Sequence, residues 1–420
     1  MRALRSAAAV VGIVVALGLG APAADADQTP PASAPSMDAG QQCTPGKRLL
    51  SSAPSYLVDR LGLAEAWTLS RGRGVTVAVV DSGVQAGNVH LKGALVPGFT
   101  SFGGGSAPAD ADVAGHGTAV AGLIAARRVE GSGVIGIAPQ AKIMPVRAFE
   151  AAPDSNGSSR DLVVPTTASI VAGIRWAADH GAQIINVSLS DDGSAGAYRS
   201  AVDYAHDRGA LVIASAGNRR TAGTDGPDPA HFYPGELPGA LAVAAVLADG
   251  SWSAESSYAG EHVDIAAPGQ SVPTAYISGG DCVLNPDSAS SSYATAIISG
   301  AAALIASRYP DESPDEWAFR LTQSALRVSP GQRSDTVGWG EVRPAGALAL
   351  IDDGSLPGPD SPAHPPQKPE PQAERTVDLD PVSDPLDPAR VIVGWGLGAG
   401  ATISIVLLLI SRSRARRLPG

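Results

Sequence analysis

Short apolar runs alternate with segments of helical periodicity over the middle of the chain. Residues 167–180 and 200–208 carry apolar side chains at the spacing of one helix face. Uninterrupted apolar runs of strand length are typical of a parallel sheet that is covered on both faces. Six such runs are expected to be strands: 74–83, 141–146, 183–189, 210–214, 241–246 and 262–267. The alternation predicts an α/β fold, a three-layer arrangement with a mostly parallel central sheet flanked by helices.

Residues 288–304 combine a cluster of small hydroxyl side chains with an Ala-rich apolar run of helical spacing. This pattern places a serine at the N-terminus of a buried helix. Unpaired backbone N–H groups and the positive end of the helix dipole can stabilise an alkoxide or an oxyanion there. A serine that only caps the helix is the alternative interpretation.

Both ends of the chain carry apolar segments. Residues 1–26 contain two arginines, an apolar run and closing small residues, which predicts a secretory signal peptide; an uncleaved N-terminal anchor is the alternative. Residues 391–410 contain no charge and precede an arginine-rich tail, residues 411–420. They predict a transmembrane helix with a cytoplasmic C-terminus, and a buried soluble helix is the alternative. The rest of the mature chain is then expected outside the cell membrane.

Pro-rich segments separate these ends from one folded domain. Residues 27–54 and 352–389 are polar, rich in Pro and poor in large apolar side chains. Such a composition cannot bury enough surface to fold, so we expect an N-terminal leader and a stiff, extended linker. The folded domain is expected to cover residues 55–351.

Composition excludes several classes of function. A net charge of −11 over 420 residues, without a basic stripe, argues against a nucleic-acid partner. Cys43 and Cys282 are the two cysteines and form no Cys-x-x-Cys motif, so a zinc or redox site is not expected. In an exported protein they are candidates for a disulfide, with two free thiols as the alternative. No acidic cluster has the spacing of a calcium loop, and we predict neither a metal nor a cofactor.

Two predicted elements carry residues suited to acid–base chemistry. Asp81 ends an apolar run, and the carboxyl ends of parallel strands are where α/β folds place functional groups. A turn or cap aspartate is the alternative. His116 lies between two glycines, which allow the close backbone approach that a base acting on a substrate needs. The other histidines lack such a context and are expected at the surface or in packing: His90, His180, His206, His231, His262 and His364.

Asn218 follows another predicted strand, from which its side-chain amide can point at a developing oxyanion; a turn asparagine is the alternative. With Ser292 from the hydroxyl cluster, the chain order is Asp81, His116, Asn218, Ser292. A serine nucleophile needs a base, the base needs a carboxylate, and the tetrahedral oxyanion needs preorganised donors. The four residues together therefore predict nucleophilic serine catalysis.

These motifs resemble those of the subtilisin-like serine proteases, the subtilases or peptidase family S8, over about residues 75–307. Val-Asp-Ser-Gly-Val at Asp81, Gly-His-Gly-Thr-Ala-Val-Ala-Gly at His116 and Ala-Ser-Ala-Gly-Asn at Asn218 are each similar to a family motif. The resemblance implies a subtilisin-like fold and a serine endopeptidase. It implies a triad of Asp81, His116 and Ser292, with Asn218 in the oxyanion hole. The implied substrate-binding residues are Ser188, Leu189, Ser190 and Gly217.

The order of signal, Cys-containing leader, catalytic domain, Pro-rich linker, span and basic tail most resembles the mycosins. These are membrane-anchored subtilases associated with the type VII secretion systems of actinobacteria. The resemblance implies secreted protein or peptide substrates and a type VII secretion membrane complex as partner.

The chain departs from the usual family pattern near its nucleophile. Ser290-Ser291-Ser292 stands where the family usually has Gly-Thr-Ser, and Ala296 replaces a proline. These departures favour a second hypothesis, a weakly active or inactive protease that acts as a structural component of the secretion complex. Asp191, at the implied substrate edge, either favours basic substrate residues or is simply solvated. A lipase or esterase is disfavoured because the chain contains no Gly-x-Ser-x-Gly motif.

Overall fold

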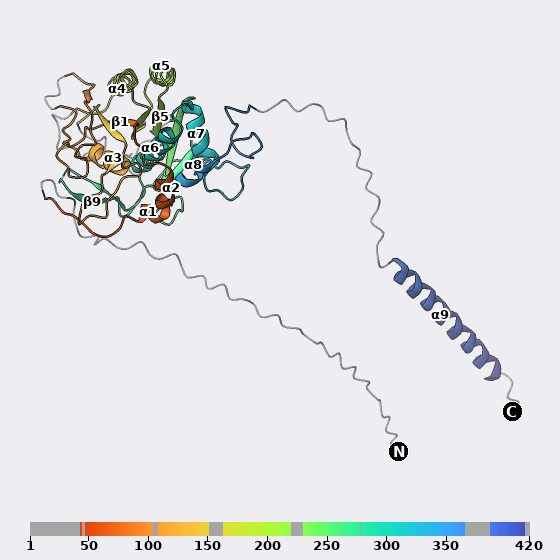
Figure 1. Ribbon diagram of the computed structural model, residues 1–420. Coiled ribbons are helices and arrows are strands. Elements are labelled where there is room, and N and C mark those ends of the chain that lie inside the picture. Colours follow the sequence, from red (N-terminus) through yellow and green to blue (C-terminus); the bar gives the residue numbers. More distant parts are fainter. Residues whose placement is uncertain are drawn as a thin grey trace. The chain divides into compact units, whose positions relative to one another are not determined.

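A computed structural model of the chain describes residues 43, 47–103, 108–150, 163–219, 230–277, 279–365 and 387–415. The chain divides into two compact units, Met1–Pro366 and Gln367–Gly420. The first unit contains a sheet with its covering helices, and the second contains one long helix (Figure 1). The predicted signal peptide, most of the predicted leader and linker, and the end of the basic tail lie outside the described residues.

A seven-stranded sheet forms the centre of the first unit, in the order β2-β3-β1-β4-β5-β6-β7 with all neighbours parallel. This confirms the predicted fold class, and each of the six predicted runs overlaps one strand. The seven strands are β1 (Thr76–Asp81), β2 (Phe99–Thr100), β3 (Lys142–Arg147), β4 (Ile184–Val187), β5 (Leu211–Ser215), β6 (Ala240–Val246) and β7 (Ile265–Pro268).

Three strands were not predicted from the apolar pattern. Strand β2 is two residues long, too short to form a recognisable run. The other two, β8 (Val272–Ala275) and β9 (Asp281–Leu284), form a separate antiparallel pair. Pro273 interrupts the first, and a proline normally argues against a strand because it cannot donate to the ladder.

Helices cover both faces of the sheet. Successive side chains along a strand point to opposite faces, so a continuous apolar strand needs cover on both. On β1, Val77 and Val79 face one core, and Ala78 and Val80 face the other. The first core includes side chains of α1 (Tyr56–Arg60), α2 (Leu63–Leu69), α3 (His116–Ala125), α6 (Ser291–Arg308), α7 (Pro314–Gln323) and α8 (Pro344–Ala349). The second includes side chains of α4 (Thr167–Asp179) and α5 (Ala195–His206).

Helix α6 is the central helix of the domain, and every residue from Ser291 to Ala306 is buried. Its many Ala residues and its one Gly allow neighbouring backbones to approach closely. At Gly300, for instance, an added Cβ would lie 2.6 Å from the Cβ of Ile137. The helix runs along β4, β5, β6 and β7. This packing fixes its N-terminus, which carries Ser292, against the sheet.

The folded unit extends past residue 351, where we had expected the linker to begin. The carbonyl oxygen of Pro357 accepts hydrogen bonds from Gln323 Nε2 at 3.2 Å and Arg327 Nη2 at 3.4 Å. Asp352 accepts a hydrogen bond from Ser361, which is itself buried. Residues 352–365 therefore fold back onto α7 through side-chain contacts that a count of Pro and polar residues does not reveal.

The second unit contains α9 (Asp387–Ala415). Within it, Pro388–Ser413 is long and apolar enough to cross a membrane, with a mean hydropathy of 2.1. This range includes the predicted span, residues 391–410. Length and composition make α9 a candidate membrane anchor.

Candidate active site

The predicted catalytic residues occupy the ends of four elements. Asp81 is the last residue of β1, and His116 is the first of α3. Ser292 lies in the first turn of α6, and Asn218 follows β5. Strands β1, β4 and β5 are parallel neighbours, so their carboxyl ends form one edge of the sheet.

Asp81 and His116 form a close pair. The His116 Nδ1 atom lies 2.8 Å from Asp81 Oδ1 and 2.9 Å from Oδ2. The carboxylate is fully buried, whereas the imidazole is 22% exposed. Because a carboxylate accepts, Nδ1 donates, and in the neutral ring Nε2 then carries the lone pair that a general base needs.

The glycines on either side of His116 are required by close packing. An added Cβ at Gly117 would lie 2.1 Å from the carbonyl oxygen of Gly83 and 3.2 Å from Asp81 Oδ1. Gly115 has a φ of +84°, and an added Cβ there would meet the ring of Tyr276. These two residues let the first turn of α3 approach β1 closely enough for the imidazole to reach the carboxylate.

A second aspartate, Asp112, organises the start of α3, and we did not predict it. Its Oδ1 accepts hydrogen bonds from Ser82 Oγ at 2.9 Å and from the N–H groups of Ala114 and Gly115. Its Oδ2 accepts from both the N–H and the hydroxyl of Thr118, at 2.9 and 2.6 Å. The signal was an Asp followed at short intervals by the residues that open a helix, a pattern typical of N-terminal capping.

Ser82 connects this network to the catalytic candidates. Its Oγ donates to Asp112 and accepts from the N–H of Gly117 at 3.0 Å. Its own N–H donates to Asp81 Oδ1 at 2.7 Å. One residue thus contacts the aspartate of the pair and the backbone that carries the histidine.

Ser292 is held by reciprocal contacts with the end of β4. Its Oγ donates to the carbonyl oxygen of Ser188 at 2.8 Å, and the Ser188 hydroxyl donates to the Ser292 carbonyl at 2.9 Å. Asn186 Nδ2 in turn donates to Ser188 Oγ at 2.8 Å, and Asn186 Oδ1 accepts from Ser299. These bonds bind α6 to β4 and make Ser188 part of the support of Ser292.

Asn218 contacts the hydroxyl cluster directly. Its Oδ1 accepts a hydrogen bond from the N–H of Ser291 at 2.7 Å, and its Nδ2 lies 3.4 Å from Ser290 Oγ as a donor. Gly217, beside it, has a φ of +95°, and a Cβ there would overlap the rings of Phe232 and Tyr258. The amide therefore lies at the positive end of α6, next to the residue that replaces the usual glycine.

The substrate-binding residues that the family resemblance implies are only partly exposed. Leu189 and Ser190 are half-buried. Asp191 accepts hydrogen bonds from the hydroxyl of Tyr198 at 2.6 Å and from the N–H of Gly193 at 2.7 Å. Burial, reinforced by this carboxylate, raises the pKa of Tyr198. Asp191 thus holds the α5 region in place, a role that neither of its two predicted alternatives included.

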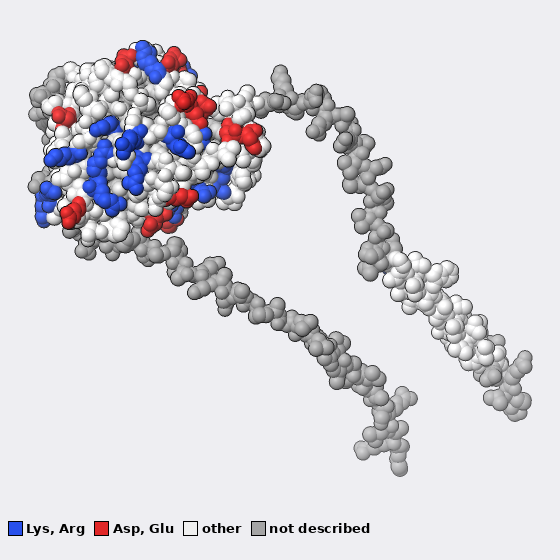
Figure 2. All heavy atoms as spheres, viewed as in Figure 1, with Lys and Arg blue, Asp and Glu red and all other residues white. Residues whose placement is uncertain are grey.

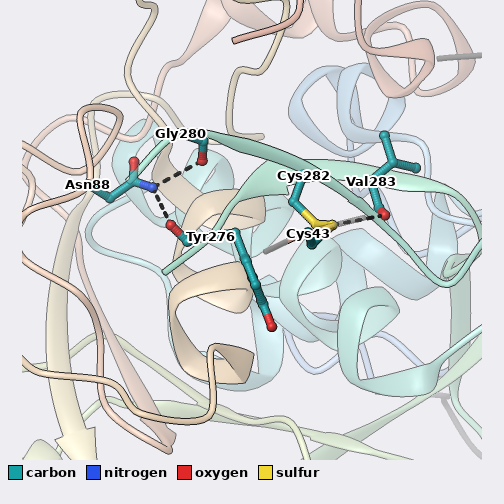
Figure 3. Close-up of a disulfide and its surroundings, with 6 residues drawn as sticks. All are labelled: Cys43, Asn88, Tyr276, Gly280, Cys282 and Val283. Carbon is teal, nitrogen blue, oxygen red and sulfur yellow. Dashed lines mark hydrogen bonds between the residues drawn. A yellow bond between two sulfur atoms is a disulfide. The ribbon is translucent and has the colours of Figure 1, made fainter. Parts of the chain in front are cut away.

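The N-terminal segment is tied to the same domain. Cys43 and Cys282 form a disulfide with a Cα–Cα distance of 5.5 Å (Figure 3). The Sγ of Cys43 also lies 3.6 Å from the carbonyl oxygen of Val283. Asn88 Nδ2 donates to the carbonyls of Tyr276 and Gly280, which lie next to the bridge (Figure 3).

Asp281 adds a second connection to the leader. Its N–H donates to the carbonyl of Leu49 at 2.7 Å, and its Oδ2 accepts from the N–H of Ser51 at 2.8 Å. The part of the leader that the structure describes is therefore packed along β9. Among the described residues, no group of three or more His, Cys, Asp or Glu side chains is placed to hold a metal ion.

The sequence and the fold of this chain are similar to those of known proteins. Residues 72–340 match the subtilase family. Mycosin-3 of Mycobacterium tuberculosis is 32% identical over 391 residues, covering 79% of this chain and 81% of that protein.

Solved structures show the same similarity. The MycP3 protease from the type VII (ESX-3) secretion system is 30% identical with a TM-score of 0.61, covering 74% of this chain and 94% of that one. A chain of the ESX-5 inner membrane complex is 27% identical with a TM-score of 0.63, covering 88% and 94%. Since the family match spans more than half of the sequence, and the sheet and helices agree with it, this chain belongs to the subtilase family of serine proteases and is similar to the mycosins within it.

Proposed function

We propose that the chain is a serine endopeptidase in which Ser292 is the nucleophile, His116 the general base and then acid, and Asp81 the residue that orients His116. The observation that carries this proposal is the close contact of a buried carboxylate with Nδ1 of a partly exposed imidazole. That pairing leaves Nε2 to accept the serine proton. It also stabilises the imidazolium that results.

The first step requires a movement of the serine hydroxyl. In the structure, Ser292 Oγ donates to the carbonyl of Ser188. For attack, this proton passes instead to His116 Nε2 while Oγ bonds to the substrate carbonyl carbon. The carbonyl oxygen becomes the oxyanion, which the N–H of Ser292 and the amide of Asn218 would stabilise. The imidazolium then returns its proton to the leaving amine, and water repeats the sequence to release the acid.

We further propose that the protease is anchored in the cell membrane by α9 and acts with a type VII secretion membrane complex on secreted proteins. The names of its relatives support this association, since MycP3 is described as a protease of the type VII (ESX-3) system. The apolar stretch Pro388–Ser413 supports the anchor. The arginines after it favour a cytoplasmic C-terminus, with the protease domain outside the membrane.

A second function, that of a structural component with little activity, is favoured by one contact. Ser290 stands where the family usually has glycine, and its hydroxyl accepts a hydrogen bond from the Asn218 amide. An oxyanion donor that already has an internal acceptor loses part of its advantage in the transition state.

Labelling with a fluorophosphonate probe separates the two functions. The full chain, solubilised in detergent, is compared with Ser292→Ala, which removes the proposed nucleophile, and with Ser307→Ala, a half-buried serine near the other end of the same helix. The protease hypothesis expects labelling of the wild type and of Ser307→Ala but not of Ser292→Ala. A folded wild-type chain that does not label would contradict it. Normal secretion in a Ser292→Ala strain, together with lost secretion in a deletion strain, would support the structural function.

A further inference from the structure

His262 lies in the turn before β7 and reaches the segment that carries Asn218. It is half-buried, and its Nε2 lies 3.2 Å from the carbonyl oxygen of Ala216, 46 residues earlier in the chain. Because a carbonyl oxygen only accepts hydrogen bonds, Nε2 carries the proton and donates. Ala216 stands two positions before Asn218, the residue proposed to stabilise the oxyanion. Residues 215–218 are called the oxyanion segment below.

The His262 ring contacts the same segment through Phe232. The two rings stack with their centres 4.4 Å apart and their planes inclined by 12°. Phe232 is buried and packs against Gly217, where an added Cβ would lie 2.7 Å from atoms of its ring. One side chain therefore contacts Ala216 directly and Gly217 through a buried ring.

Other contacts of the oxyanion segment involve different groups. The N–H of Ala216 donates to the carbonyl of Val243 at 2.9 Å, and Asn218 Oδ1 accepts from the N–H of Ser291 at 2.7 Å. These bonds hold an N–H group and an amide oxygen, whereas His262 binds a carbonyl. Ala216 is fully buried, and a buried carbonyl that loses its donor is energetically costly. Loss of the His262 donor should therefore displace the segment.

His262 makes these contacts as a neutral ring. Charged side chains gather at the surface of the domain, where many Lys and Arg cover the face near α2 and α3 (Figures 1 and 2). Burial of His262, in contrast, lowers the pKa of its imidazole. The carboxylates of Glu236 and Asp335 oppose this effect, and the charge of Arg333 reinforces it. At pH 7.5 the ring is therefore neutral, so its stack on Phe232 buries no charge.

We propose that His262 is a positioning residue for the proposed oxyanion hole. Its Nε2–H and its stack on Phe232 hold the oxyanion segment so that the Asn218 amide can reach the oxyanion of the substrate. The inference rests on the proposed protease function, since it names a further residue on which that site depends. His262 acts through Ala216 and Phe232 and takes no part in proton transfer.

The second-order rate of fluorophosphonate labelling, measured on the full chain in detergent at pH 7.5, tests this. His262→Phe keeps a ring for the stack but removes the donor, so we expect labelling about tenfold slower. His262→Gln supplies an amide donor and should stay within about threefold of the wild type.

A matched control is His180→Phe, which should leave the labelling rate unchanged. The His180 ring stacks on Trp176 with centres 3.8 Å apart, and its Nδ1 lies 2.7 Å from the Trp176 carbonyl oxygen. It therefore makes the same two kinds of contact as His262, but at the end of α4.

A double variant shows whether His262 acts through Asn218. Asn218→Ala alone should slow labelling about 10²–10³-fold, as loss of one oxyanion donor typically does. Adding His262→Phe to it should change the rate by less than about twofold, because the group that His262 positions is already absent. Equal slowing by His262→Phe in both backgrounds would overturn the proposal.

Two further results would overturn it. One is a folded His262→Phe variant that labels at the wild-type rate even if its stability is lower, and the other is a His262→Gln variant as slow as His262→Phe. Either result, with a wild type that labels at Ser292, leaves the proposed function intact. A folded wild type that does not label would instead overturn the proposed function and this inference with it.

Discussion

The pairs His116–Asp81 and His90–Asp281 are alike in chemistry and nearly equal in length, at 2.8 and 2.7 Å, yet they differ in how far the imidazole is exposed. His90 Nε2 contacts Asp281, and its Nδ1 contacts the carbonyl oxygen of Arg127 at 2.8 Å. Both ring nitrogens of His90 are therefore engaged by groups inside the protein. Its ring is fully buried, whereas that of His116 is 22% exposed.

The difference shows that a histidine–carboxylate contact alone does not define a catalytic site. An imidazole works as a base only when one nitrogen keeps a lone pair and a substrate can reach it. Both His90 nitrogens are engaged inside the protein and its ring is fully buried, so His90 meets neither condition. Asp281 instead uses its remaining groups to hold Leu49 and Ser51 of the leader. The His116–Asp81 pair therefore suits the proposed chemistry, whereas the His90–Asp281 pair attaches the N-terminal segment.

The largest difference between the two pairs is expected when Asp81 and Asp281 are each replaced by asparagine. Asp81→Asn should slow fluorophosphonate labelling about 10⁴-fold, because the amide favours the wrong tautomer of His116 while leaving the packing intact. The measurement is the second-order labelling rate of the full chain in detergent. The free energy of unfolding should change little. A labelling rate within tenfold of the wild type would contradict the proposed role of Asp81.

Asp281→Asn should have the opposite effect, lowering the free energy of unfolding while leaving the labelling rate nearly unchanged. It removes the carboxylate of the buried His90–Asp281 pair, and loss of one partner of such a buried pair costs about 3–5 kcal/mol of stability. Urea unfolding followed by tryptophan fluorescence measures this loss. Labelling at Ser292 should stay within threefold of the wild type below the unfolding transition. Unchanged stability would contradict a structural role for the His90–Asp281 pair.

The two pairs also mark the limits of prediction from sequence. The parallel sheet was predictable because six strands are continuous apolar runs between helical segments. Asp81 ends one of these runs, and His116 stands between two glycines that close packing requires. His90 and Asp281 are 191 residues apart with no such local context, so only the folded chain shows that they meet. The same applies to the contact between Asp191 and Tyr198, which depends on how α5 packs. It also applies to the contact between Pro357 and Gln323 of α7. Local pattern predicts elements, whereas contacts between distant loops depend on the assembled fold.

The disulfide beside Asp281 should contribute somewhat less than the buried pair. Replacing Cys43 and Cys282 together by serine removes a cross-link over a sequence separation of 239, and loss of a native disulfide typically costs about 2–4 kcal/mol. Because Asp281 still holds Leu49 and Ser51, the labelling rate should remain unchanged. Urea unfolding under non-reducing conditions measures the difference. A large loss of labelling in the folded double variant would instead connect the leader to the active site.

The smallest change in labelling rate is expected at Ser82, which joins the His116–Asp81 pair to Asp112. Ser82→Ala removes the hydroxyl that donates to Asp112 and accepts from the Gly117 N–H. Each such bond contributes about 0.5–1.5 kcal/mol, so we expect labelling about 3–10-fold slower. Ser82→Thr keeps the hydroxyl and should restore the rate to within twofold. A merely structural serine would lower stability in the alanine variant without changing the labelling rate of the folded protein. A slower rate with rescue by threonine would show that His116, unlike His90, depends on a hydrogen-bond network that positions it.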